Sequence, residues 1–319
     1  MPKKTFQNHF IKTLKRLGGF LIAGLFVLAV IFAFSRPSLS PGTETKDLKA
    51  DNEVLGSNSG DTFPADNDGN VNVSVGEGVK ADSYLVYDET SGKVLSSRNP
   101  NTAVAIASIT KLMTAYITQK YGNLEDTWAI NSASTSSIHP VLGLVPGDKV
   151  IIKDLVDAML IGSANDSAAA LGAYVSSIKK QPVIDVMNNE AKALGMNSTH
   201  YENPIGFDSE QNYSTASDLK LLLNAVRPLS LFSEIDRKQS YSFVSQTGKT
   251  YSVKATNTLL ASDPDIHAIK TGFTDEAKGA MITAIHHDDK KFIIIVLGST
   301  DREDDTKLLK KHILEEILQ

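Results

Sequence analysis

The order of strand-like and helical segments after residue 80 constrains the fold of this chain more than any other feature. Apolar alternation predicts strands at 83–88 and 93–98, and the Glu-Thr-Ser-Gly between them is a hairpin signal. Three further apolar runs predict strands near the carboxyl end, at 266–273, 279–286 and 291–298, followed by a helix from about residue 304. Because strands stand at both ends, we expect one sheet assembled from the two ends, with helices packed on it.

The region between these strands is predicted to be mainly helical. Apolar periodicity indicates four helices, at 108–120, 153–175, 183–194 and 215–226. Thr215 and Asp218 have the spacing of a helix N-cap box. A second hairpin is expected from the strand-like runs 241–244 and 250–254 around Gln-Thr-Gly-Lys.

The amino terminus has the pattern of a membrane segment. Residues 17–35 carry no charge, and five basic residues and no acidic one lie before them, which predicts a cytoplasmic basic tail at 1–16. As a helix the run would span about 28 Å, close to the thickness of the bilayer core. We therefore expect a single-pass transmembrane anchor with the rest of the chain outside. The alternative is secretion after cleavage of a signal peptide, for which 33–35 offers only a mediocre small-x-small site.

Composition separates a linker from a folded domain. Residues 36–77 are rich in Ser, Gly, Pro, Asn and Asp and contain one aromatic residue, so we expect a flexible linker before a domain at 78–319. The net charge is −5 although the terminus is basic, so the domain is acidic and a poor binder of nucleic acid. The absence of cysteine excludes disulfides, thiol catalysis and Cys-ligated metal centres.

One Ser-x-x-Lys motif has the chemistry of an activated nucleophile. Ser108 and Lys111 lie one turn apart, so a helix brings the hydroxyl and the amine to one face. A serine needs a base, and Lys111 can act as one if burial and nearby cations lower its pKa. Three other copies, which are ordinary surface-helix patterns, occur at Ser176/Lys179, Ser177/Lys180 and Ser217/Lys220.

Two motifs downstream distinguish the first copy from the rest. Ser163 and Asn165 place a hydroxyl and an amide two residues apart, and Lys270-Thr271-Gly272 falls on a predicted strand. Each element taken singly has an ordinary structural explanation, such as a helix cap for Ser163. The ordered set of three, each on its own helix, loop or strand, is much less expected by chance.

These motifs and their surroundings resemble the penicillin-recognising serine enzymes, and within them the low-molecular-mass D-alanyl-D-alanine carboxypeptidases of peptidase family S11. The likeness covers about residues 80–310. It extends to the segments AIASITKLMTAY, LVPGDKVIIKDLVDAMLIGSANDSAAAL, ALGMNSTHYENPIGFD, YSTASDLKLLL and IKTGFTDEAKGAMI. The resemblance implies a β-lactamase/transpeptidase-like α+β fold, with an antiparallel sheet and an inserted helical subdomain.

The resemblance also implies the role of each motif residue in a serine DD-carboxypeptidase. Ser108 would form an acyl-ester, Lys111 would accept its proton, and Ser163 would relay that proton to the leaving amine. Among the substrate-binding residues, Asn165 would bind the substrate amide, and Lys270 and Thr271 would bind the terminal carboxylate, with Thr274 beside that pocket. Gly272 would let the substrate backbone lie against the strand. The backbone N–H groups of Ser108 and Phe273 would form the oxyanion hole. Neither a metal nor a cofactor is expected.

The expected substrate is a peptidoglycan stem peptide that ends in D-Ala-D-Ala, cleaved during cell-wall biogenesis, with β-lactams as covalent inhibitors. Three alternatives remain: a DD-endopeptidase of the same family, a class A-like β-lactamase, and a non-catalytic penicillin-binding scaffold. The β-lactamase pattern Glu-x-x-Leu-Asn does not occur at Glu190, Glu202 or Glu210. Ala268 and the step Ala277-Lys278-Gly279 depart from the family's usual residues around the Lys-Thr-Gly strand.

Overall fold

The computed structural model describes residues 78–132, 138–227 and 232–317. The predicted basic tail, apolar run and linker lie outside these residues, as does the whole of the unit Met1–Gly60 into which the chain divides. Within the described ranges, no helix combines the length and the apolarity that crossing a membrane requires.

A five-stranded antiparallel sheet joins the two ends of the domain, as predicted. Its strands are β1 (Ser83–Asp88), β2 (Val94–Arg98), β9 (Ile266–Thr274), β10 (Lys278–His287) and β11 (Lys290–Ser299). They stand in the order β2-β1-β11-β10-β9, so the first strand pairs with the last. This order makes β9, which carries Lys270, an edge strand.

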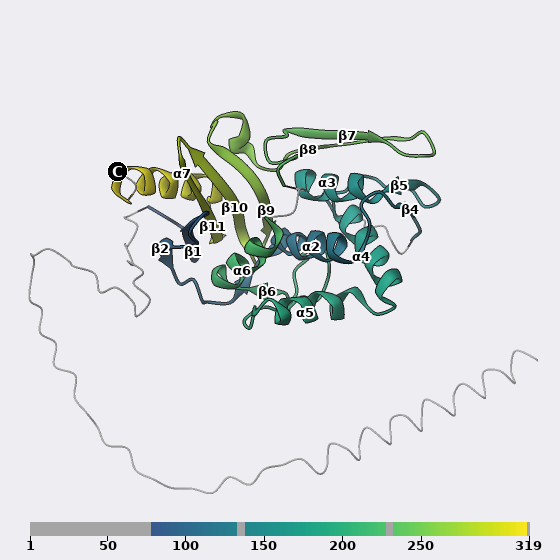
Figure 1. Ribbon diagram of the computed structural model, residues 1–319, viewed down its shortest axis with the longest axis horizontal. Coiled ribbons are helices and arrows are strands. Elements are labelled where there is room, and N and C mark those ends of the chain that lie inside the picture. The colour runs from purple at the N-terminus through teal and green to yellow at the C-terminus, as the bar shows by residue number, and fades with distance from the viewer. Residues whose placement is uncertain (1–77, 133–137, 228–231, 318–319) are drawn as a thin grey trace, which may run out of the picture. The chain divides into compact units, whose positions relative to one another are not determined.

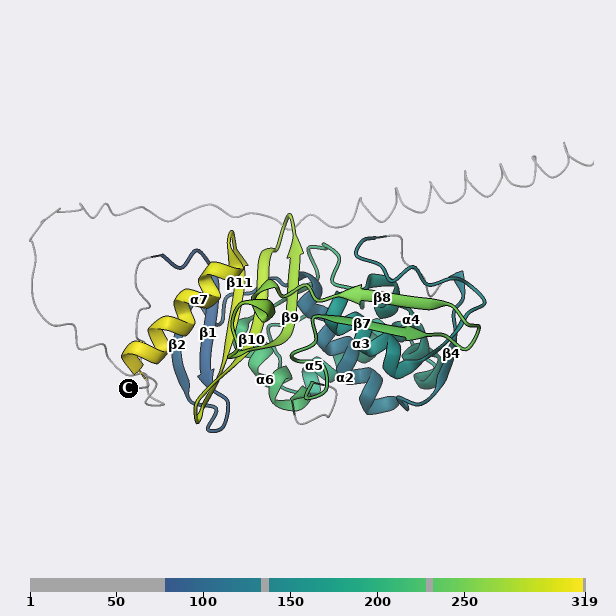
Figure 2. The same cartoon turned by 90° about the horizontal axis from the view of Figure 1, so that it is seen from above.

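The two faces of the sheet pack against different helices (Figures 1 and 2). Helix α7 (Arg302–His312) covers one face, where Met281 and Leu309 belong to a small apolar core. On the opposite face Ile282 and Ile295 belong to a larger core, which the sheet shares with the central helices. Successive residues of β10 therefore enter different cores, as the two-residue period of a strand requires.

The helical part of the domain lies between β2 and β9, as expected. It consists of η1 (Ala107–Thr110), α2 (Lys111–Tyr121), α3 (Ile152–Gly162), α4 (Asn165–Lys179), α5 (Val183–Ala193) and α6 (Ala216–Val226). The predicted N-cap of α6 is confirmed, because Thr215 Oγ1 accepts a hydrogen bond of 3.0 Å from the Asp218 N–H. The α-helix predicted from residue 108 begins at Lys111 instead, after the 3₁₀ turn η1.

The single helix predicted at 153–175 is wrong. The chain breaks at Ser163, which is left-handed with φ 57° and ψ 27°, and continues as α4. Gly162 ends α3 where a strand packs closely, since a Cβ there would lie 2.4 Å from Val253 Cβ. The apolar periodicity runs through the break, so it gives no sign of this contact, which comes from a strand far along the chain.

Three two-stranded ribbons and two short helical segments complete the fold. They are β3 (Val104–Ala105) with β6 (Tyr213–Ser214), β4 (Thr127–Ala129) with β5 (Lys149–Ile151), β7 (Ser240–Val244) with β8 (Thr250–Lys254), η3 (Thr258–Ala261) and η4 (Ile313–Ile317). The ribbon β7–β8 is the second predicted hairpin, and it lies along α3 in both views (Figures 1 and 2). After β8, which lies beside α3, the chain continues to the edge strand β9.

Candidate active site

Ser108 and Lys111 form a hydrogen-bonded pair at the start of the first central helix. Lys111 Nζ lies 2.7 Å from Ser108 Oγ. The pair spans η1 and the first residue of α2, and a 3₁₀ turn brings residues three apart directly above one another. Lys111 is fully buried, whereas Ser108 is partly exposed. A buried amine therefore meets a hydroxyl that solutes can reach.

The loop after α5 holds the Lys111 amine in place. Lys111 Nζ also donates to the carbonyl of Ile205, and Thr114 Oγ1 donates to the Pro204 carbonyl at 2.8 Å. Gly206 is required at the next position, because a Cβ there would lie 2.0 Å from the Ala107 carbonyl oxygen. The loop thus packs directly on the residue before Ser108.

Ser163 and Lys270 form a second pair, between the helical part and the sheet. Lys270 Nζ donates 2.9 Å to Ser163 Oγ and 2.7 Å to the Thr271 carbonyl. Both side chains are buried. Ser163 has a left-handed backbone and lies at the break between α3 and α4. Tertiary packing sustains this conformation, which directs the Ser163 hydroxyl towards the edge strand β9.

Asn165 follows as the first residue of α4 and has its amide partly engaged. Its Nδ2 donates 2.8 Å to the Ile138 carbonyl, and its backbone N–H donates 2.8 Å to the Pro140 carbonyl. Asp166 ties the same loop down through hydrogen bonds of 2.7–2.9 Å from the backbone N–H groups of residues 142–144. These hydrogen bonds fix the loop against the start of α4, beside Ser163.

The edge strand β9 approaches Ser108 at Gly272. A Cβ on Gly272 would lie 3.0 Å from the Ser108 backbone nitrogen and 3.1 Å from Ala107 Cβ. Any side chain at residue 272 would push β9 away from η1. The next residue, Phe273, has an exposed side chain. The backbone N–H groups of Ser108 and Phe273 thus belong to segments in direct contact.

The two lysines carry unusual electrostatics. Burial, with the charge of Lys270 as the second cause, holds the pKa of Lys111 well below its ordinary value. Burial, with the charge of Arg302 as the second cause, lowers the pKa of Lys270 to about 7. A lysine whose pKa is lowered loses its proton at a lower pH than an ordinary lysine, and a neutral amine of this kind is what a general base requires of Lys111.

Arg302 is a site residue that sequence reasoning missed. It begins α7, and its Nη1 donates 2.6 Å to the carbonyl of Gly272. It adds a second cation beside the Lys-Thr-Gly strand. No local sequence pattern distinguishes Arg302 from the other charged residues at the start of α7. Only the packing of α7 on the sheet brings Arg302 close to β9.

The remaining predicted residues take the following places. Thr271 is buried, and its hydroxyl pairs with that of Thr256. Thr274 ends β9, where its Oγ1 accepts 3.0 Å from the Ala277 N–H within the β9–β10 turn. Thr274 is thus engaged in the turn. Within the described ranges, no cluster of three or more His, Asp or Glu side chains has the arrangement of a metal site.

Comparisons with known proteins identify the family of this chain. The profile of the family described as D-alanyl-D-alanine carboxypeptidase matches residues 70–301, well over half of the chain. The chain is 27% identical over 237 residues to D-alanyl-D-alanine carboxypeptidase DacF of Bacillus subtilis, covering 72% of this chain and 61% of the relative. It is 36% identical over 204 residues to the D-alanyl-D-alanine endopeptidase of Pseudomonas aeruginosa, covering 63% and 65%. The match thus spans less than two thirds of these relatives' length.

A solved structure shares the fold. The D-alanyl-D-alanine carboxypeptidase of Mycobacterium tuberculosis H37Rv superposes with a TM-score of 0.68 at 27% identity, covering 79% of this chain and 95% of that chain. The family profile, which matches residues 70–301, spans all three motifs and the sheet that joins them. The chain belongs to the family of D-alanyl-D-alanine carboxypeptidases.

Proposed function

We propose that this protein is a serine DD-carboxypeptidase that removes the terminal D-alanine from peptidoglycan stem pentapeptides during cell-wall biogenesis. The observation that carries the proposal is the pair of hydrogen bonds Lys111–Ser108 and Lys270–Ser163 on either side of one site. This arrangement supplies a nucleophile, a base, a proton relay and a cation, which hydrolysis of a peptide with a free carboxylate requires.

Acylation begins with Ser108 Oγ attacking the carbonyl between the two terminal D-alanines. Neutral Lys111 takes the hydroxyl proton as the new C–O bond forms, and the backbone N–H groups of Ser108 and Phe273 stabilise the oxyanion. The C–N bond then breaks, and Ser163 passes a proton from Lys111 to the departing D-alanine. Asn165 holds the amide of the peptide that remains attached.

Deacylation repeats these steps with water in place of the amine. Lys111 takes a proton from the water as its oxygen attacks the ester, and that proton returns to Ser108 Oγ when the ester bond breaks. The products are the shortened peptide and the free enzyme. No metal or cofactor enters this scheme.

Recognition of the substrate falls to the edge strand. Lys270 as an ammonium and Thr271 as a hydroxyl donor form charge-assisted hydrogen bonds with the terminal carboxylate. Arg302, bonded to Gly272, adds positive potential at the same end of β9. The substrate backbone lies along β9, which is free to accept it because β9 is the edge of the sheet.

The deciding experiment offers the purified protein three substrates: a stem pentapeptide, a cross-linked stem dimer and a β-lactam. Release of D-alanine from the pentapeptide, with slow turnover of the lactam, is the expected result. Preferential cleavage of the dimer would assign the protein to the endopeptidases, the alternative favoured by the Pseudomonas aeruginosa relative. Rapid lactam hydrolysis would indicate a β-lactamase, and no reaction with any substrate would indicate a scaffold.

We also propose a location for the protein, on the basis of its amino-terminal sequence. The uncharged run 17–35 behind five basic residues supports a single-pass anchor that leaves the catalytic domain outside the cell membrane. Protease added to intact cells should then remove the domain, and an amino terminus beginning after residue 35 would instead indicate secretion. A protein found soluble in the cytoplasm would contradict both.

A further inference from the structure

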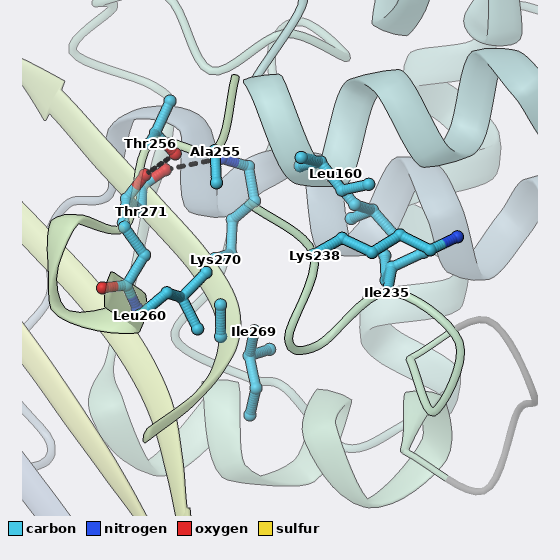
Figure 3. A pocket seen from close by; sticks show the side chains of 12 residues that line it. Leu160, Ile235, Lys238, Ala255, Thr256, Leu260, Ile269, Lys270 and Thr271 are labelled. Atoms are coloured by element: carbon cyan, nitrogen blue, oxygen red, sulfur yellow. Dashed lines mark hydrogen bonds between the residues drawn. The ribbon is translucent and has the colours of Figure 1, made fainter. Parts of the chain in front are cut away.

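Thr256 connects the helical and sheet sides of the site. It follows β8, and its backbone N–H donates 3.2 Å to the carbonyl of Ile161, two residues before Ser163. Its side-chain hydroxyl pairs with the hydroxyl of Thr271 on β9. Thr256 thus contacts both the end of α3, next to Ser163, and the strand β9, which carries the proposed carboxylate-binding residues (Figure 3).

The direction of the hydroxyl pair follows from the chemistry of its acceptor. Each hydroxyl has one proton to donate, and a carboxylate accepts hydrogen bonds but donates none. If Thr271 donates its proton to the substrate carboxylate, the proton between the two threonines must come from Thr256. The result is a chain from Thr256 through Thr271 to the carboxylate, and such chains strengthen each bond by polarisation.

A small cavity adjoins Thr271. A cavity of about 20 Å³ lies behind β9, and Thr256, Lys270 and Thr271 all line it, together with Leu160 and Leu260 (Figure 3). A side chain that borders a void lacks contacts on that side, so its rotamer is less restricted by packing. The hydrogen bond between the Thr256 and Thr271 hydroxyls therefore helps to fix the Thr271 rotamer.

We propose that Thr256 is a positioning residue for carboxylate recognition, donating to Thr271 so that the Thr271 proton points at the substrate carboxylate. The inference rests on the proposed function and extends it to a residue outside the three motifs. It predicts that loss of the Thr256 hydroxyl weakens reactions of ligands that carry the carboxylate and spares matched ligands that lack it.

The test measures acylation by benzylpenicillin, which has a free carboxylate, and by its methyl ester. Thr256→Val should slow acylation by the acid roughly three- to ten-fold, the value of one neutral hydrogen bond, and change the ester rate by less than about two-fold. Thr256→Ser retains the hydroxyl and should restore the acid rate. The matched control is Thr258→Val, because Thr258 is an exposed threonine two residues away.

Coupling to Thr271 separates positioning from general damage. Thr256→Val should add little to the loss caused by Thr271→Val, because both remove the same chain of bonds. Equal losses on acid and ester, additive losses in the double variant, or no loss at all would overturn the inference. If Thr256→Val fails to fold, Thr256→Ala against Thr256→Ser carries the same comparison.

The two levels of the proposal fail in different ways. A wild-type protein that is acylated by benzylpenicillin but releases no D-alanine contradicts the carboxypeptidase function and leaves the threonine comparison intact. A wild-type protein that neither lactam acylates contradicts both. Normal D-alanine release with unaltered acylation in Thr256→Val contradicts the positioning role alone.

Discussion

Lys270 Nζ lies 2.9 Å from Ser163 Oγ, although the two residues are 107 positions apart in the chain. The contact joins the edge strand of the sheet to the break between two helices. Because Lys270 also lowers the pKa of Lys111, the two lysines form one electrostatic unit. The site therefore exists only when the sheet and the helical part are packed together, and changes at Lys270 should alter both recognition and chemistry.

Lys270→Ala should reduce kcat/KM for a peptide with a free carboxylate roughly 30- to 1000-fold, the value of a lost charge-assisted contact of 2–4 kcal/mol. The loss should shrink on the same peptide with an amidated terminus, because that peptide never used the charge. Steady-state kinetics on the two peptides provide the measurement.

Lys111→Ala serves as the contrasting variant. It removes the base, so it should abolish turnover of both the acid and the amide. Equal losses on acid and amide in Lys270→Ala would show instead that Lys270 acts mainly in the proton network of Ser163.

The rate should pass through a maximum as pH changes. Lys111 must be neutral to act as the base, so kcat/KM should rise as pH increases through its lowered pKa. Lys270 has a pKa of about 7 and must be protonated to bind the carboxylate, so kcat/KM for the acid peptide should fall above about pH 7. The profile of kcat/KM between pH 5 and 10 is the measurement, since it reports the free enzyme.

Lys270→Arg supplies the control for this profile, because arginine stays charged throughout and should remove the decline on the alkaline side. An acid-peptide rate that stays level from pH 7 to pH 10 in the wild type would argue against a role for the Lys270 ammonium in binding.

Asp157 on α3 should be a source of instability at neutral pH. Its side chain is fully buried, Oδ1 has no hydrogen-bond partner, and burial raises its pKa despite the 2.9 Å pair with Lys153. The folded state thus disfavours the charged form of Asp157. The free energy of unfolding therefore falls as pH rises from the pKa of Asp157 in the unfolded chain through its higher pKa in the folded protein. Asp157→Asn should raise Tm by a few degrees at pH 7, measured by calorimetry.

The gain should shrink near pH 3, where Asp157 is protonated in the wild type. Lys153 keeps its other partner, Glu234, at 3.0 Å, so the variant strands no buried charge. Asp289→Asn, at an exposed position of the turn between β10 and β11, is the control and should leave Tm unchanged. A lower Tm for Asp157→Asn at pH 7 would mean that the ion pair outweighs the cost of burial.

Local patterns were enough to predict the sheet and the Ser108–Lys111 pair. Strand periodicity and turn residues act over short distances, and a hydroxyl and an amine three residues apart meet on any helical turn. The break at Ser163 was not predictable from apolar periodicity, because it depends on Val253 packing against Gly162 from a distant strand. Arg302 and Thr256 were missed for the same reason, since their roles come from the packing of α7 on the sheet and from the contact of the segment after β8 with β9.

The role of Ser108 as the nucleophile is tested most directly by mass spectrometry after reaction with benzylpenicillin. We expect one covalent adduct, located on the peptide that contains Ser108. It should be absent in Ser108→Ala and retained in Ser176→Ala, which alters another Ser-x-x-Lys copy. An adduct on Ser163, or none on the wild-type protein, would contradict the assignment of Ser108 as the acylated residue.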